Sequence, residues 1–189
     1  VVFQPGLNEE LAATAVWGTQ QAEMRGDGKY DGVFGMWYGK GPGVDRSGDV
    51  FKHGNAAGVS PHGGVLLLAG DDHACKSSTL PHQSEHAFDA AMIPVLYPTG
   101  VAEIIEMGLH GFAMSRFSGL WIAIKSVTDT LETAGVPDGG ADAIEPGALV
   151  RGLRRREGRA GQLFGVEPVI DLLWRVTADW QGARERFGL

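Results

Sequence analysis

The sequence contains a single cysteine, Cys75, among its 189 residues. One cysteine excludes an internal disulfide framework, and it excludes any iron–sulfur or zinc site built from cysteines alone within this chain. No run of about eighteen apolar residues occurs, so no membrane-spanning helix is expected. Because no initiator methionine or signal segment precedes Val1, we expect a fragment of a longer protein. The single cysteine makes a reducing, cytoplasmic setting the default expectation.

Basic residues are scarce in the first part of the chain. Residues 1–133 carry eight Lys or Arg and fifteen Asp or Glu, whereas residues 134–189 carry eight of each, which gives the formal net charge of −7. An acidic domain is poorly suited to the phosphate backbone, so we expect no nucleic-acid partner.

A continuous apolar run, residues 65–69, ends abruptly at Gly70-Asp71-Asp72-His73. Such a run, bounded by turn residues, is typical of a parallel strand covered on both faces. Ligands of parallel sheets bind at the carboxyl ends of the strands. The sequence therefore predicts a polar site lined by Asp71, Asp72, His73, Lys76, Ser77 and Ser78.

The remaining elements alternate between strand and helix patterns, which predicts an α/β fold with a three-layer parallel sheet. We expect strands at residues 1–3, 31–38, 93–97 and 120–124, and helices at 9–23, 49–57 and 100–117, with Asn8 and Thr99 as N-caps. The glycine-rich residues 39–49 are interpreted as a loop lining a site, because they lack the endings of a P-loop or a dinucleotide turn. Residues 134–148 are expected to form a linker and residues 149–189 a helical appendage.

Two motifs suggest hydrolases. His82-x-x-Glu85-His86 matches an inverted zinc-protease pattern, in which two His one helical turn apart bind the metal, but no third ligand is evident. Asp71, His73 and Ser77 supply the residue types of a Ser/His/Asp site, although no nucleophile elbow is present. The alternative interpretation of the His82 motif is a surface or subunit-contact helix. The alternative for Asp71, His73 and Ser77 is a polar loop at the end of a strand.

Three stretches closely resemble the large indolepyruvate ferredoxin oxidoreductases, which belong to the thiamine-diphosphate-dependent 2-oxoacid:ferredoxin oxidoreductases. They are residues 2–13 (VFQPGLNEELAA), 30–49 (YDGVFGMWYGKGPGVDRSGD) and 63–98. The resemblance implies that residues 1–133 form the pyrimidine-binding domain. It implies that Glu9, in an Asn-Glu-x-x-Ala context, hydrogen-bonds N1′ of the aminopyrimidine, with Glu10 left as a capping residue.

The same resemblance implies further roles. The loop from Asp71 to Ser78 and the glycine-rich residues 38–46, which include Gly41 and Gly43, would lie near the cofactor and the substrate. From their position and charge, Lys40, His73 and Lys76 are the candidate partners of the substrate carboxylate. Asp71, Asp72 and Ser77 are expected to line the same substrate site. Mg²⁺ and the diphosphate would be bound by a domain absent from this chain, and [4Fe-4S] clusters would lie elsewhere in the longer protein. The substrates would be an aryl 2-oxoacid and coenzyme A, ferredoxin would accept the electrons, and a homo-oligomer is expected. The alternative is a non-catalytic assembly module that kept the fold.

Overall fold

A computed structural model describes residues 2–135 of the chain. The expected linker and C-terminal appendage lie outside these residues, apart from the first two linker positions. The described part is an α/β domain built on a parallel four-stranded sheet with the strand order β1-β2-β4-β3. The strands are β1 (Phe34–Lys40), β2 (Gly64–Asp71), β3 (Val95–Leu96) and β4 (Ile122–Val127). The prediction of a parallel three-layer fold is confirmed.

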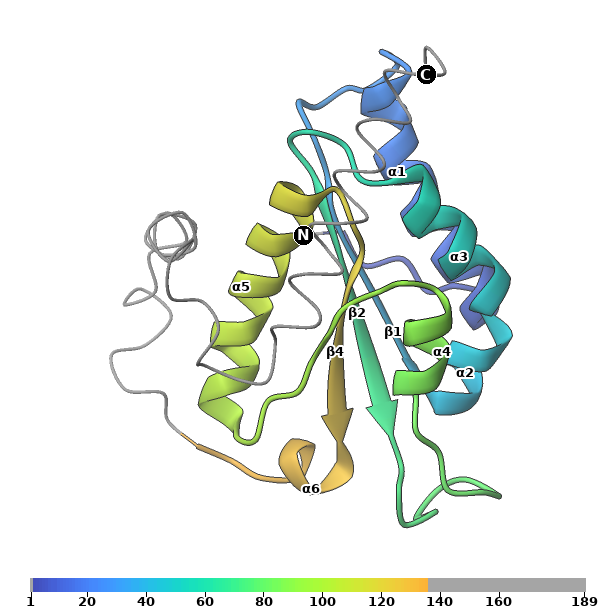
Figure 1. Cartoon of the computed structure of the whole chain (residues 1–189), viewed down its shortest axis with the longest axis vertical. Helices are drawn as coiled ribbons and strands as arrows, with labels where there is room; N and C mark the ends of the chain where they lie inside the picture. Colours follow the sequence, from blue (N-terminus) through green and yellow to red (C-terminus); the bar gives the residue numbers. More distant parts are fainter. Residues whose placement is uncertain (1, 136–189) are drawn as a thin grey trace. The chain divides into compact units, whose positions relative to one another are not determined.

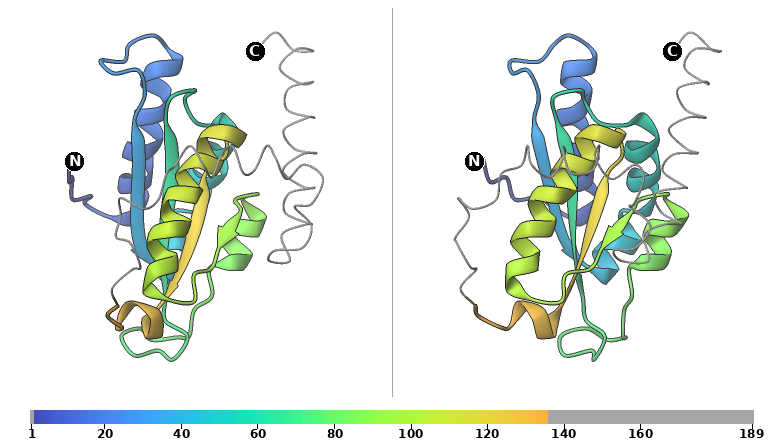
Figure 2. Two further views of the ribbon diagram at one scale, coloured as in Figure 1. Left: turned by 90° about the vertical axis from the view of Figure 1, so that its left-hand side faces the viewer. Right: turned by 60° about the vertical axis from the view of Figure 1, so that its left-hand side comes forward.

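Helices cover both faces of this sheet (Figure 1). One face packs on α1 (Glu9–Met24), α3 (Gly48–Ala57) and α4 (Glu85–Ala90), and the other on α5 (Val101–Ser118). The pleat of β2 explains the two cores, because Val65, Leu67 and Ala69 face the α1 side and Leu66 and Leu68 face α5. Figure 2 shows the sheet from the α5 side, where α5 lies in front of the strands.

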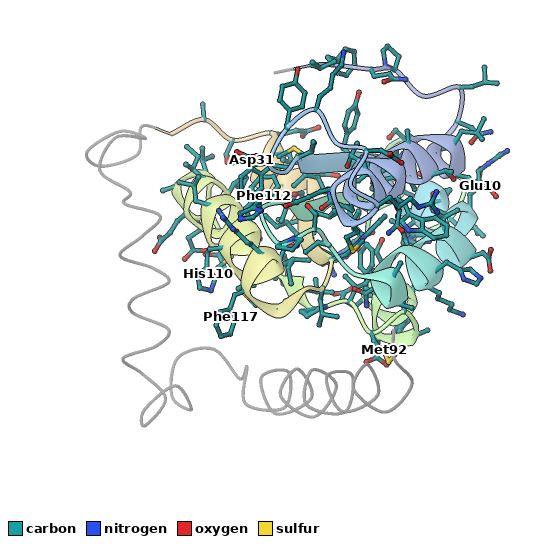
Figure 3. All side chains as sticks on the ribbon, turned by 90° about the horizontal axis from the view of Figure 1, so that it is seen from above. Glu10, Asp31, Met92, His110, Phe112 and Phe117 are labelled. Atoms are coloured by element: carbon teal, nitrogen blue, oxygen red, sulfur yellow. The ribbon has the colours of Figure 1, made fainter. Side chains whose placement is uncertain are left out.

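Among the described residues, β1 has exposed apolar side chains on the side of the sheet that faces α5. Phe34 packs edge-to-face on Phe112 of α5, with ring centroids 5.1 Å apart. Met36 and Tyr38 lie farther along the same face of β1 and remain exposed. In Figure 3, His110 and Phe117 mark the outer side of α5, away from the sheet.

Most predicted elements are present with shifted ends. Asn8 caps α1 as expected, because its Oδ1 accepts a hydrogen bond of 2.9 Å from the backbone N–H of Leu11. Gly100, not Thr99, is the N-cap of α5, and Thr99 instead donates its backbone N–H and its hydroxyl to Glu103. None of the helices in residues 2–135 is both long enough and apolar enough to cross a bilayer.

The glycine-rich segment differs from its prediction. Instead of a loop it contains the helix α2 (Gly41–Arg46), followed directly by α3. Pro42 stands in the first turn of α2, where its missing N–H removes no helical hydrogen bond. Gly41, Gly43 and Val44 are buried, so tertiary packing outweighs the low helix propensity of glycine.

The expected strand at residues 1–3 is also wrong for the two positions that the structure describes. Val2 and Phe3 are assigned to no strand and are exposed. An apolar pattern alone cannot make a strand, because a strand also requires a neighbour to accept and donate its backbone hydrogen bonds.

Candidate functional site at the carboxyl ends of the strands

The three long strands end at the same edge of the sheet. β2 runs parallel to both of its neighbours, β1 and β4. The last residues of the three strands, Lys40, Asp71 and Val127, therefore lie together at the carboxyl edge of the sheet. The described part of the chain adds α2, the loop after β2 and α6 (Thr128–Leu131) there. The residues that follow β2 therefore lie at this edge, and their role as a binding site stays a prediction.

Asp71 is enclosed by protein groups. Its carboxylate accepts hydrogen bonds from the backbone N–H of Ser84 at 2.8 Å and from the Ser84 hydroxyl at 2.6 Å. The Nζ of Lys125 lies 3.8 Å from Asp71 Oδ2, and both side chains are almost fully buried. These contacts favour a structural role for Asp71, and a substrate could reach it only if they opened.

Lys125 is the buried centre of this group. Its ammonium donates to Glu85 and lies 5.0 Å from the centroid of the Tyr97 ring. Burial acts to raise the pKa of Glu85, but the hydrogen bond and charge of Lys125 contribute to a net pKa below the ordinary value. Lys125 thus joins β4 to α4 and to the end of β2.

His82 connects the loop after β2 to α2. Its Nε2 lies 2.8 Å from Asp45 Oδ2, its Nδ1 lies 3.5 Å from Asp71 Oδ1, and its ring rests against Gly41. The helix α4 begins at Glu85, after His82, so His82 and His86 do not share a helical face as the zinc interpretation requires. Within residues 2–135 no three His, Cys, Asp or Glu side chains are grouped to hold a metal ion.

The loop after β2 folds around Asp72. Asp72 accepts hydrogen bonds from the backbone N–H groups of Ser77, at 2.8 Å, and Lys76, at 2.9 Å, and these bonds hold its pKa below the ordinary range. Lys40 donates to the Ser77 carbonyl at 2.8 Å and to the Ser77 hydroxyl at 2.7 Å, and its Nζ is 3.7 Å from Asp72. The loop is therefore closed onto the end of β1.

The two basic residues of this loop that were predicted to bind a substrate carboxylate, Lys76 and His73, lie in different surroundings. The ammonium of Lys76 turns to α6, where Glu132 at 3.3 Å and Asp129 at 3.7 Å raise its pKa. His73 is exposed. Of the three candidates for a substrate carboxylate, Lys40 is the one that the structure builds into the edge of the sheet, and its side chain is still 43% exposed.

Glu9 begins α1 beside α2. Its backbone oxygen accepts a 2.9 Å hydrogen bond from the indole N–H of the buried Trp37 on β1. Its side chain is half-buried and lies across Gly43. Glu10 is exposed and lies at the outer rim of α1 in Figure 3. Glu9 contacts α2 at Gly43, and His82 contacts it at Gly41. Two positions correspond to about 200° around a helix, so the two side chains lie on nearly opposite sides of α2. The helix therefore separates Glu9 from His82 and the Asp71 group.

The structure also reveals site residues that sequence reasoning missed, namely Asp45, Ser84, Glu85 in its contact with Lys125, and Lys125 itself. One signal was present for Lys125. A lysine that follows the apolar run of residues 120–124, beside a strand that ends in an aspartate, predicts an ion pair near the shared edge, provided that the strand order is known.

Acidification gives one test of the Asp72 loop. Because the pKa of Asp72 is lower in the folded protein than its ordinary 3.8, its carboxylate stabilises the fold fully above that value and loses this effect as pH falls through the folded pKa. Asp72→Asn is expected to lower the unfolding midpoint near pH 7 and to flatten its decline below about pH 4. Urea titrations across this range, with the exposed Asp31→Asn as control, measure both effects. Equal acid profiles for wild type and Asp72→Asn would contradict the expectation.

Comparison with known proteins finds two distant relatives of this sequence. The chain is similar to indolepyruvate oxidoreductase subunit IorA of Methanothermobacter thermautotrophicus, with 26% identity over 144 residues, which cover 76% of this chain and 22% of that protein. It is similar to the subunit of the same name from Methanothermobacter marburgensis, with 25% identity over 156 residues, 82% of this chain and 23% of that protein. The chain thus spans less than a quarter of the length of these relatives. No protein-family model matches it.

Proposed function

We propose that this chain contributes the aminopyrimidine-binding half of a thiamine diphosphate site in a 2-oxoacid:ferredoxin oxidoreductase of the indolepyruvate type. The similarity to two proteins named indolepyruvate oxidoreductase subunit IorA supports an oxidoreductase related to 2-oxoacid metabolism. The single observation that carries the proposal is the setting of Glu9, a half-buried carboxylate at the first position of a capped helix, supported by Trp37 and Gly43.

The residues present fit the pyrimidine half of that cofactor. Among the described residues, the hydrogen bond that ties Glu9 to another element uses its backbone oxygen, so its carboxylate is available to a ligand. Glu9 would hold a proton between this carboxylate and N1′ of the aminopyrimidine. When bound, thiamine diphosphate would supply the nucleophilic carbon and the electron sink for decarboxylation of the 2-oxoacid.

Groups at the carboxyl edge of the sheet would act on the substrate. Lys40, held by Ser77 and balanced by Asp72, would attract the 2-oxoacid carboxylate with its exposed part. His73 is exposed and could face the same ligand, whereas Lys76 is engaged by α6. The diphosphate and Mg²⁺ site, the [4Fe-4S] clusters, and the sites for ferredoxin and coenzyme A would be supplied by other parts of a longer, oligomeric protein.

The test compares two neighbouring glutamates in the complete protein. Glu9→Gln removes the ionisable group that is proposed to share the proton and should reduce thiamine-diphosphate-dependent turnover of indolepyruvate by about a hundredfold or more. Glu10→Gln changes the same side chain one residue later, at an exposed position, and should leave turnover within about twofold of wild type. The measurement is the rate of ferredoxin reduction at saturating cofactor.

Two results would contradict the proposal. The first is wild-type turnover that does not depend on added thiamine diphosphate after the protein has been freed of it. This result would refute the proposal that thiamine diphosphate is the cofactor. Equal rates for Glu9→Gln and Glu10→Gln would remove the role of Glu9.

A further inference from the structure

We propose that Gly43 is a positioning residue for Glu9. In this inference, which rests on the function proposed above, the missing side chain at residue 43 lets the Glu9 side chain lie across α2 and thereby sets the direction of its carboxylate. Gly43 was expected from sequence to approach the cofactor itself. In the structure the side chain of Glu9 lies against Gly43.

The contact is too close for any larger residue. A Cβ built on Gly43 would lie 2.5 Å from Cγ, 3.2 Å from Cδ and 3.3 Å from Cβ of Glu9. Carbon atoms in contact are normally about 3.5–4.0 Å apart. Since Cγ is in the middle of the glutamate side chain, relief requires rotation about χ1 or χ2, and either rotation moves the carboxylate.

The backbone of Glu9 cannot easily move to relieve the contact. Its carbonyl oxygen is bonded to the Trp37 indole, and Trp37 is 2% exposed and packs edge-to-face on Phe51, with centroids 5.0 Å apart. The hydrogen bond that Asn8 Oδ1 accepts from the Leu11 N–H fixes the same turn of α1. The side chain of Glu9 is therefore the part that must yield.

Alanine at position 43 isolates this steric effect. Gly43 is not among the residues with positive φ, so alanine meets no backbone penalty there, and it favours a helix more than glycine does. Gly48, the first residue of α3, is the matched control, because a Cβ there would meet nothing within 4 Å.

The experiment uses the complete protein and measures the dissociation constant of thiamine diphosphate by calorimetry, together with the circular dichroism of the bound aminopyrimidine. Gly43→Ala is expected to weaken cofactor binding by about tenfold and to reduce the signal of the iminopyrimidine tautomer. Its urea unfolding midpoint should be at least that of wild type. Gly48→Ala should retain the wild-type tautomer signal.

A double variant separates positioning from direct contact. If Gly43 acts through Glu9, Gly43→Ala should cause no further loss of affinity in a Glu9→Gln background, whereas independent effects would add. Additive losses would overturn the inference, because they would mean that residue 43 touches the cofactor directly. Wild-type behaviour of Gly43→Ala, with a loss in Glu9→Gln, would overturn it while leaving the proposed function intact. Failure of the wild-type protein to bind thiamine diphosphate would refute the proposed function, and the inference with it.

Discussion

Lys125→Met is expected to lower the free energy of unfolding of the domain by about 3–5 kcal/mol, because it leaves the buried carboxylate of Asp71 without its cation. Lys125 is 3% exposed and contacts both Asp71 and Glu85. Methionine replaces the aliphatic stem, so the loss reflects the charge more than the packing. The lysine also faces Tyr97, which adds a cation–π contact that methionine cannot make.

Urea unfolding of the chain near neutral pH measures this loss. Lys52→Met, at an exposed position of α3, is the matched control and should change the free energy of unfolding by less than about 0.5 kcal/mol. A Lys125→Met/Glu85→Gln double variant should be less destabilised than the sum of the single variants, because the two side chains form one interaction. Similar effects of Lys125→Met and Lys52→Met would show that the group at the sheet edge contributes little to stability.

Asn55→Ala is expected to be nearly as harmful, at about 3 kcal/mol or more, because two buried backbone groups and one partly buried backbone group lose their partner. Asn55 is 4% exposed. Its Nδ2 donates to the carbonyls of Ala91 and Met92, both at 2.9 Å, and its Oδ1 accepts from the backbone N–H of Trp121 at 2.9 Å. One side chain of α3 thus holds the turn after α4 and the chain entering β4.

Thermal and urea unfolding of Asn55→Ala measure the loss, with the exposed Lys52→Ala in the same helix as control. Asn55→Asp separates the two halves of the amide, since aspartate keeps an acceptor for Trp121 but has no N–H for the two carbonyls. It should also be strongly destabilised, because its charge would be buried beside carbonyl oxygens. Stability of Asn55→Ala within about 0.5 kcal/mol of Lys52→Ala would contradict the assignment of Asn55 as a bridge.

Local patterns were sufficient for the central elements. The apolar run at residues 65–69 predicted β2, and Asn8 followed by two glutamates predicted the start of α1. These succeed because burial on both faces and capping depend on residues that are neighbours in the sequence. The alternation of strand and helix patterns along the sequence likewise predicted the parallel sheet.

The failures share one cause, which is contact between residues distant in sequence. Residues 41–46 have the composition of a loop, yet they form α2 because His82 and Glu9 pack on glycines that leave room for them. His82 itself suggested a zinc ligand, but its ring nitrogens face Asp45 and Asp71, 37 and 11 positions away. The burial of Lys125 depends on the order of the strands, which periodicity does not specify.

The amino-acid sequence by itself determined the α/β class, the capped helix that presents Glu9, and the polar residues that follow β2, because each depends on local propensity and hydrophobic period. Only the tertiary structure decided which of those polar groups are enclosed and which remain accessible. Asp71 is enclosed by Ser84 and Lys125, whereas Lys40 and Glu9 keep part of their surface. The reason is physical: a charged group needs a partner once water is removed, and the fold alone brings that partner within reach.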